Sequence, residues 1–152
     1  MAAVAVKYPA FRELRAEVLA VSVDTVATHK DWQEQELSKM VEGGARFPML
    51  ADAGGRIGSL FGVHDREAGV NMRAHFLIDP QGMIQAMEVV AAPIGRNVAE
   101  ILRQLRALAH YRSTGRYMPC GWEPGKPALS MEGDSPASSG KVWEIWKPSS
   151  AF

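Results

Sequence analysis

The chain has 152 residues, of which 17 are basic and 17 acidic, so its formal net charge is zero. This balance predicts no electrostatic attraction to nucleic acid, and no apolar run approaches the roughly 18 residues that would indicate a membrane span. The single cysteine, Cys120, excludes an intrachain disulfide and indicates a reducing, cytoplasmic location.

The first half of the chain alternates helical and strand patterns. Apolar residues at helical spacing predict a helix over residues 2–15. The valine-rich run 17–23 predicts a strand covered on both faces, as in a parallel sheet. A helix over 29–42, ended by two glycines, and a short strand over 48–52 follow.

The second half predicts an antiparallel hairpin between two helices. Residues 53–61 form the first helix, with Leu60 inward, and residues 62–70 form a loop. The strands 72–79 and 83–90 are joined by a tight turn with a proline at its second position, which requires antiparallel pairing.

A long helix follows Asn97, a suitable N-cap, and runs to about Tyr111. Three arginines lie off its apolar stripe and are expected on a solvated face; they are Arg103, Arg106 and Arg112. Residues 123–141 are rich in proline, serine and glycine and predict an extended arm. We therefore predict a domain over 1–112 and a C-terminal arm over 113–152.

Cys120 lies between Pro119 and Gly121, which predicts a turn that exposes the sulfur to a partner. An inert thiol is the alternative, because a free cysteine often serves as a small hydrophobe. One cysteine cannot complete a zinc site, and the four histidines have no short ligand spacing, so we expect no metal or cofactor.

Taken in order, these segments resemble the typical two-cysteine peroxiredoxins, the alkyl hydroperoxide reductase C group. The matching segments share their order and spacing with that family over residues 1 to about 125. They are residues 16–24, His29 with Trp32, residues 47–52, residues 61–63, Arg73 with residues 76–79, residues 93–98, and residues 119–122 with Pro124 and Gly125.

The resemblance implies an α/β, thioredoxin-like fold with a mixed sheet, and an enzyme that reduces hydrogen peroxide and organic hydroperoxides. In this family a peroxidatic cysteine becomes a sulfenic acid and a resolving cysteine of the partner subunit then forms a disulfide with it. Cys120 matches the resolving cysteine. The implied partners are a second copy of the chain, in a homodimer or in a decamer built from such dimers, and thioredoxin or a similar dithiol reductant.

The resemblance also implies roles for three further residues. Arg73 matches the arginine that favours the thiolate and donates hydrogen bonds to the peroxide, with a surface arginine as the alternative. Arg96 matches a second, supporting arginine, and solvent exposure or helix capping is its alternative. Trp32 matches a residue that lines the pocket, with core packing as the alternative.

One departure from the family pattern concerns the nucleophile. Met1 aligns with the residue directly after the family's Cys-Pro-Thr-Glu motif, so the peroxidatic motif and the N-terminal strands are missing from the sequence. We hypothesise that a selenocysteine or cysteine lies upstream of Met1. The alternative is a non-catalytic thioredoxin-fold fragment that acts as a binding or mixed-disulfide partner.

Overall fold

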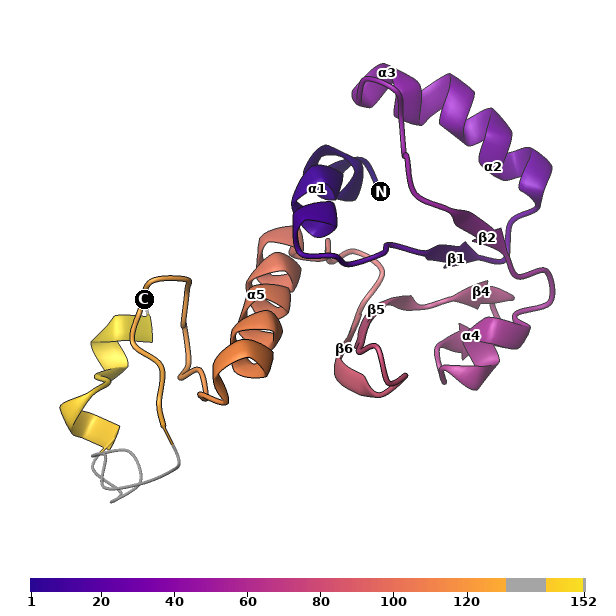
Figure 1. The fold of residues 1–152 in the computed structure, drawn as a ribbon. Helices are drawn as coiled ribbons and strands as arrows, with labels where there is room; N and C mark the ends of the chain where they lie inside the picture. The colour runs from indigo at the N-terminus through magenta and orange to yellow at the C-terminus, as the bar shows by residue number, and fades with distance from the viewer. Residues whose placement is uncertain (131–141, 152) are drawn as a thin grey trace. The chain divides into compact units, whose positions relative to one another are not determined.

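The computed structural model describes residues 1–130 and 142–151, in which helices alternate with short strands (Figure 1). The chain divides into two compact units, Met1–Val98 and Ala99–Phe152, which are described separately below. The division into a domain over 1–112 and an arm over 113–152 stays a prediction.

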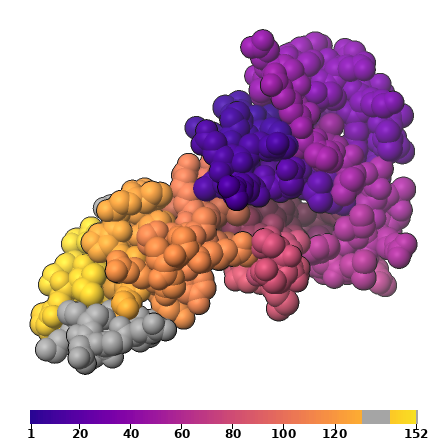
Figure 2. Space-filling model, viewed as in Figure 1, coloured from indigo at the N-terminus to yellow at the C-terminus, as the bar shows by residue number. Residues whose placement is uncertain are grey.

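The first unit opens with helix α1, Ala2–Glu13, as the sequence predicts. Ala5 and Phe11 are its buried residues. The Tyr8 ring meets the ring of Phe47 edge-on at a centroid distance of 5.6 Å. Figure 2 shows α1 in indigo lying against neighbouring segments of the same unit. Tyr8 of α1 therefore packs on the segment that leads into strand β2.

Strands β1, Ala20–Ser22, and β2, Met49–Ala51, form a parallel pair in which Val21 lies opposite Leu50. The strand β1 is shorter than the predicted run 17–23. The prediction that both faces of this strand are covered is also wrong, since Leu19 is 61% exposed and Val21 is 37% exposed. Within the described residues β1 pairs with β2 alone, so it is not the interior strand that its apolar sequence indicates.

One helical segment joins these strands. It comprises α2, Val26–Trp32, a π-helical stretch, η1, Gln33–Leu37, and α3, Ser38–Met40. It begins three residues before the predicted start at 29, because the Thr25 side chain accepts a hydrogen bond from the backbone N–H of Thr28 and caps the helix. Leu37, within the π-helical stretch, is fully buried.

The short helix α4, Arg56–Leu60, starts later than predicted. The buried carboxylate of Asp52 accepts hydrogen bonds from the backbone N–H groups of Ile57 and Gly58 at 2.9 and 2.8 Å. The bond from Ile57 is the main reason that the pKa of Asp52 is lowered. The inward orientation predicted for Leu60 is wrong, because this side chain is 78% exposed.

The predicted loop over 62–70 contains a small antiparallel pair of strands, β3, His64–Asp65, and β4, Val70–Asn71. Two residues per strand are too few to give a readable alternation of apolar and polar residues. The pair is supported by a 3.0 Å contact between His64 Nδ1 and Asn71 Oδ1.

Strands β5, Arg73–Ile78, and β6, Ile84–Val90, form the predicted antiparallel hairpin. Asp79 organises the turn, since its Oδ1 accepts hydrogen bonds from the backbone N–H groups of Gln81 and Met83 at 2.9 Å each. The register places His75 opposite Glu88 and Arg73 opposite Val90.

Helix α5, Val98–Thr114, begins directly after Asn97, and most of it lies in the second unit. That unit also contains two short 3₁₀ helices, η2, Val142–Glu144, and η3, Pro148–Ala151. Part of the predicted arm, residues 131–141, lies outside the described residues. Within the described part of the chain, no helix combines the length and apolar character that crossing a membrane requires.

The core of the first unit yields a stability prediction. Leu37→Ala removes a fully buried side chain and leaves a cavity, so it should lower the free energy of unfolding by about 2–5 kcal/mol. Urea denaturation followed by circular dichroism measures this change. The control Leu60→Ala alters an exposed leucine and should change it by about 0.5 kcal/mol or less. Equal losses in both variants would contradict this assignment of the core.

Candidate functional site

Arg73 is the first residue of β5, and its side chain is exposed. Its Nη1 atom lies 3.4 Å from the carbonyl oxygen of Ile94, a long hydrogen bond that ties the strand start to the segment after β6. Most of the guanidinium donors of Arg73 are not engaged by that bond and can serve a ligand.

Arg96 lies in the same segment as Ile94 and is partly buried. Its Nη1 atom donates a hydrogen bond of 2.8 Å to the carbonyl oxygen of Ala74, the residue after Arg73. Burial lowers the pKa of Arg96, the charge of Arg73 lowers it further, and the charge of Glu88 opposes both. The two arginines therefore lie within electrostatic range of each other.

The amino group of Met1 lies near the same two guanidiniums. Burial lowers the pKa of this amino group, and the charges of Arg96 and then Arg73 lower it further. The start of α1 is thus close to the arginine pair, and both belong to the first unit. The fold gathers positive charge here, an environment that favours a bound anion or a deprotonated nucleophile.

Two titratable residues next to this cluster were not predicted from the sequence. His75 Nδ1 lies 3.3 Å from Glu88 Oε2 across the hairpin. Burial lowers the pKa of His75, Glu88 raises it, and Arg96 lowers it. Counting residues outward from the turn would place His75 opposite Met87, and a register shift between Leu77 and Ile78 moves it to Glu88, so the sequence carried no signal for this pair.

Trp32, the predicted pocket residue, is the last residue of α2 and is 36% exposed. Among the described residues, no ring contact or hydrogen bond joins it to either arginine, so its pocket-lining role stays a prediction. His29, which was not expected to be catalytic, is buried, and its Nε2 atom lies 2.7 Å from Ser22 Oγ at the end of β1. His29 thus links α2 to β1.

Cys120 lies in the second unit and is an exposed free thiol. The backbone N–H of Trp122 donates to the carbonyl oxygen of Pro119 at 3.1 Å and closes the turn that presents the cysteine. Gly121 has a φ of +65° and approaches Ala151 so closely that a Cβ atom would overlap its backbone. This turn needs glycine both for its backbone conformation and for space.

Trp122 anchors the turn that carries Cys120. It is buried, and its Nε1 atom donates to the carbonyl oxygen of Lys126 at 3.0 Å. Arg103 donates to the carbonyl oxygen of Trp122 at 3.0 Å and forms two hydrogen bonds with Glu100, at 2.6 and 2.8 Å. The solvated role expected for Arg103 is therefore wrong, and its spacing of three residues from Glu100 was the available signal.

Among the described residues, no group of three or more His, Cys, Asp or Glu side chains is placed to hold a metal ion. The chemistry available is that of the arginine pair with the His75–Glu88 pair in the first unit, and of the Cys120 thiol in the second. The arginine pair can bind and polarise an oxygen ligand, and the thiol can exchange with another sulfur or selenium centre.

Comparison with known proteins identifies the family. Residues 1–87 match the model of the AhpC/TSA family. The chain is similar to a selenocysteine-containing peroxiredoxin, PrxU, of Peptoclostridium acidaminophilum, with 52% identity over all of this chain and 74% of the relative. It is 35% identical to the alkyl hydroperoxide reductase C of Pseudomonas aeruginosa over 81% of this chain and 65% of that relative.

The fold agrees with this relationship. The crystal structure of the reduced 2-Cys peroxiredoxin of Plasmodium vivax superposes with a TM-score of 0.80 at 34% identity, covering 91% of this chain and 72% of that structure. The short parallel pair, the hairpin and the long helix are thus elements of a thioredoxin-like α/β fold, as the sequence predicted. The chain belongs to the AhpC/TSA family of peroxiredoxins.

Proposed function

We propose that this chain is the arginine-bearing and thiol-bearing part of a peroxidase that reduces hydrogen peroxide and organic hydroperoxides. The observation that carries the proposal is that Arg96 bonds to the carbonyl oxygen of Ala74, next to Arg73, and that both guanidiniums lie within electrostatic range of the Met1 amino group. We place the nucleophile four positions before Met1, within the field of both guanidiniums, which favours the ionised form of a thiol or selenol.

The nucleophile in this proposal is a selenocysteine or cysteine upstream of Met1. The name of the PrxU relative, which matches this chain over its whole length, supports selenocysteine. The nucleophile attacks one peroxide oxygen, the O–O bond breaks, and the other oxygen leaves as water or an alcohol after taking a proton. The nucleophile is oxidised to a selenenic or sulfenic acid.

Arg73 and Arg96 have complementary roles in this step. Arg73 has guanidinium donors available to hold the peroxide oxygens and stabilise the charge that develops as the O–O bond breaks. Arg96 donates one hydrogen bond to the Ala74 carbonyl oxygen, and this bond fixes the backbone next to Arg73. Arg96 therefore supports the position of Arg73 and adds to the positive field, and Trp32 is proposed to shield the pocket.

Cys120 completes the cycle as the resolving thiol. It condenses with the selenenic or sulfenic acid of a partner subunit, which releases water and forms a selenenylsulfide or disulfide. Thioredoxin or a similar dithiol then reduces that bond by exchange. The exposure of Cys120 supports this role, because the thiol must reach both another subunit and a reductant. We propose a homodimer, because the resolving thiol acts on a second subunit, and a location in the cytoplasm.

The coding sequence tests the proposed nucleophile. We expect an in-frame UGA or cysteine codon four positions before the Met1 codon, and a protein isolated from its source that carries the matching selenium or sulfur mass at that position. An in-frame stop with no coding sequence before it would contradict the proposal. The non-catalytic mixed-disulfide partner would then be the better account of Cys120.

Arg73 provides a test of the peroxide site in the protein that carries the nucleophile. Arg73→Gln removes the guanidinium and should slow the reaction with hydrogen peroxide by about 10²-fold, the usual effect of losing one stabilising donor. Stopped-flow measurement of the second-order rate constant gives this value. Arg66→Gln changes an exposed arginine of the β3–β4 loop and should leave the rate constant unchanged; a similar loss there would refute a specific role for Arg73.

Cys120→Ser provides a separate test of resolution. The variant should retain the first reaction with peroxide and lose the intersubunit bond, because serine cannot form it. Non-reducing electrophoresis after one equivalent of peroxide should show a covalently linked dimer for the parent protein and none for the variant. Dithiothreitol should reduce the link and return the parent protein to monomers. A linked dimer in Cys120→Ser would show that another residue resolves the oxidised nucleophile.

A further inference from the structure

The turn that carries Cys120 keeps its shape through local hydrogen bonds of Trp122. The backbone N–H of Trp122 donates to the Pro119 carbonyl oxygen at 3.1 Å, and the ring Nε1 donates to the Lys126 carbonyl oxygen at 3.0 Å. Both acceptors lie within four residues of Trp122 along the chain. These bonds define the turn itself, and they do not determine where the turn lies relative to helix α5.

The Trp122 carbonyl oxygen makes the connection to α5. It accepts a hydrogen bond of 3.0 Å from Nη1 of Arg103, which lies 19 residues away in the chain. A charged donor forms a stronger bond than a neutral one, and Trp122 is buried. Arg103, Trp122 and Cys120 all belong to the second unit. The helix thus holds the turn by a bond between a charged donor and a buried residue.

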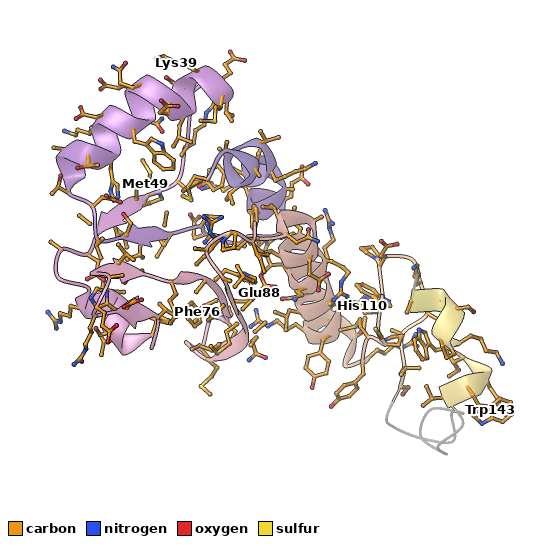
Figure 3. The ribbon with its side chains drawn as sticks, turned by 180° about the vertical axis from the view of Figure 1, so that it is seen from behind. Lys39, Met49, Phe76, Glu88, His110 and Trp143 are labelled. Carbon is orange, nitrogen blue, oxygen red and sulfur yellow. The ribbon has the colours of Figure 1, made fainter. Side chains whose placement is uncertain are left out.

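The same face of α5 also contacts the Trp122 ring. His110 lies seven residues after Arg103, about two turns along the helix, so the two side chains share a face. The His110 ring, labelled in Figure 3, lies 5.1 Å from the Trp122 ring, measured between centroids. The helix therefore contacts Trp122 at its backbone carbonyl and at its side chain.

Glu100 holds Arg103 in the orientation that reaches Trp122. The two Glu100 carboxylate oxygens accept hydrogen bonds from Nε and Nη2 of Arg103 at 2.6 and 2.8 Å. This paired contact fixes the plane of the guanidinium and leaves Nη1 for the Trp122 carbonyl oxygen. The bond to Glu100 is the main reason that the pKa of Arg103 is raised, and the charge of Cys120 also raises it. The guanidinium is thus within electrostatic range of the thiol.

A lysine makes a weaker contact with the same turn. Lys126 Nζ lies 3.4 Å from the carbonyl oxygen of Gly121 and 3.4 Å from that of Ser150. Hydrogen bonds of this length are weaker than one at 3.0 Å, and the Lys126 side chain is 42% exposed. Arg103, rather than Lys126, therefore determines how the turn is held against the helix.

We propose that Arg103 is a positioning residue for Cys120, holding the turn through the Trp122 carbonyl oxygen in an orientation that Glu100 maintains. The inference rests on the resolving role proposed for Cys120, whereas the contact itself can be tested without peroxide. Arg103 does not touch the reacting atoms in this proposal.

The reaction that benefits is the condensation with the oxidised nucleophile. The Cys120 thiolate forms a bond to the sulfur or selenium atom of the partner subunit, and hydroxide leaves that atom and takes up the proton that the thiol released. A thiol held in one orientation loses less entropy on reaching the bond-forming geometry than one on a loose segment. Arg103 therefore acts on this step and not on the reaction with peroxide.

Hydrogen exchange in the present chain, followed by NMR, tests the contact. Arg103→Met removes the donor and keeps a long, unbranched side chain. The backbone N–H of Trp122 should then exchange about 10-fold faster, because loss of a charged hydrogen bond lets the turn open more often. The N–H groups of β5, in the first unit, should keep their rates. Arg106→Met, the same change about one turn farther along α5, is the control and should leave the Trp122 rate unchanged.

An unchanged Trp122 exchange rate in Arg103→Met would overturn the proposal, as would an equal rise in Arg106→Met. A rise shared by β5 would indicate a general loss of stability and would also overturn it. If Arg103→Met does not fold, Arg103→Lys decides. A lysine keeps the charge but cannot pair with both Glu100 oxygens and reach the Trp122 carbonyl oxygen together, so exchange should again be faster. Protection equal to that of the parent would count against the positioning role.

Rapid kinetics on the protein that carries its nucleophile separate positioning from a general structural role. Arg103→Met should leave the rate constant of the peroxide step unchanged and slow the later condensation with Cys120 by about 10-fold. Equal condensation rates in parent and variant would overturn the proposal. Absence of any peroxide reaction in the parent would refute the proposed function alone, because the hydrogen exchange of Trp122 would still test the contact.

Discussion

The hydrogen bond from Arg96 to the Ala74 carbonyl oxygen is the constraint on which the candidate site depends. It ties the segment after the hairpin back to the strand that carries Arg73, at a distance of 2.8 Å. A charged donor in a partly buried place forms a stronger bond than a neutral one, so the link offsets part of the cost of burying the guanidinium. The longer bond from Arg73 to the Ile94 carbonyl oxygen joins the same two segments a second time.

The same place carries an unusual concentration of like charge. Burial and mutual repulsion lower the pKa values of Arg96 and of the Met1 amino group. A fold maintains such repulsion only when other interactions fix the geometry, here the hairpin register and the bonds to the Ala74 and Ile94 carbonyl oxygens. The electrostatic strain has a use, since it favours an anionic nucleophile or ligand at this point.

The peroxide site and the Cys120 thiol are built on different kinds of local structure. The arginine pair is built on a strand and its return segment, which fix the guanidiniums through backbone contacts. Cys120 lies on an exposed turn that depends on the left-handed conformation of Gly121 and on the buried Trp122. A rigid site suits peroxide binding, whereas an accessible thiol suits exchange with a second subunit and then a reductant.

The sequence by itself determined the hairpin, the long helix, the turn at Cys120 and the family, because turn residues, helical periodicity and ordered motifs are local signals. It also named Arg73, Arg96 and Cys120, whose catalytic roles stay proposals. Only the tertiary structure placed Arg103 on the Trp122 carbonyl oxygen, exposed Leu60 and Val21, and set His75 beside Glu88. Those outcomes depend on which surfaces meet and on the sum of several charges, and neither is encoded in the spacing of residues along one element.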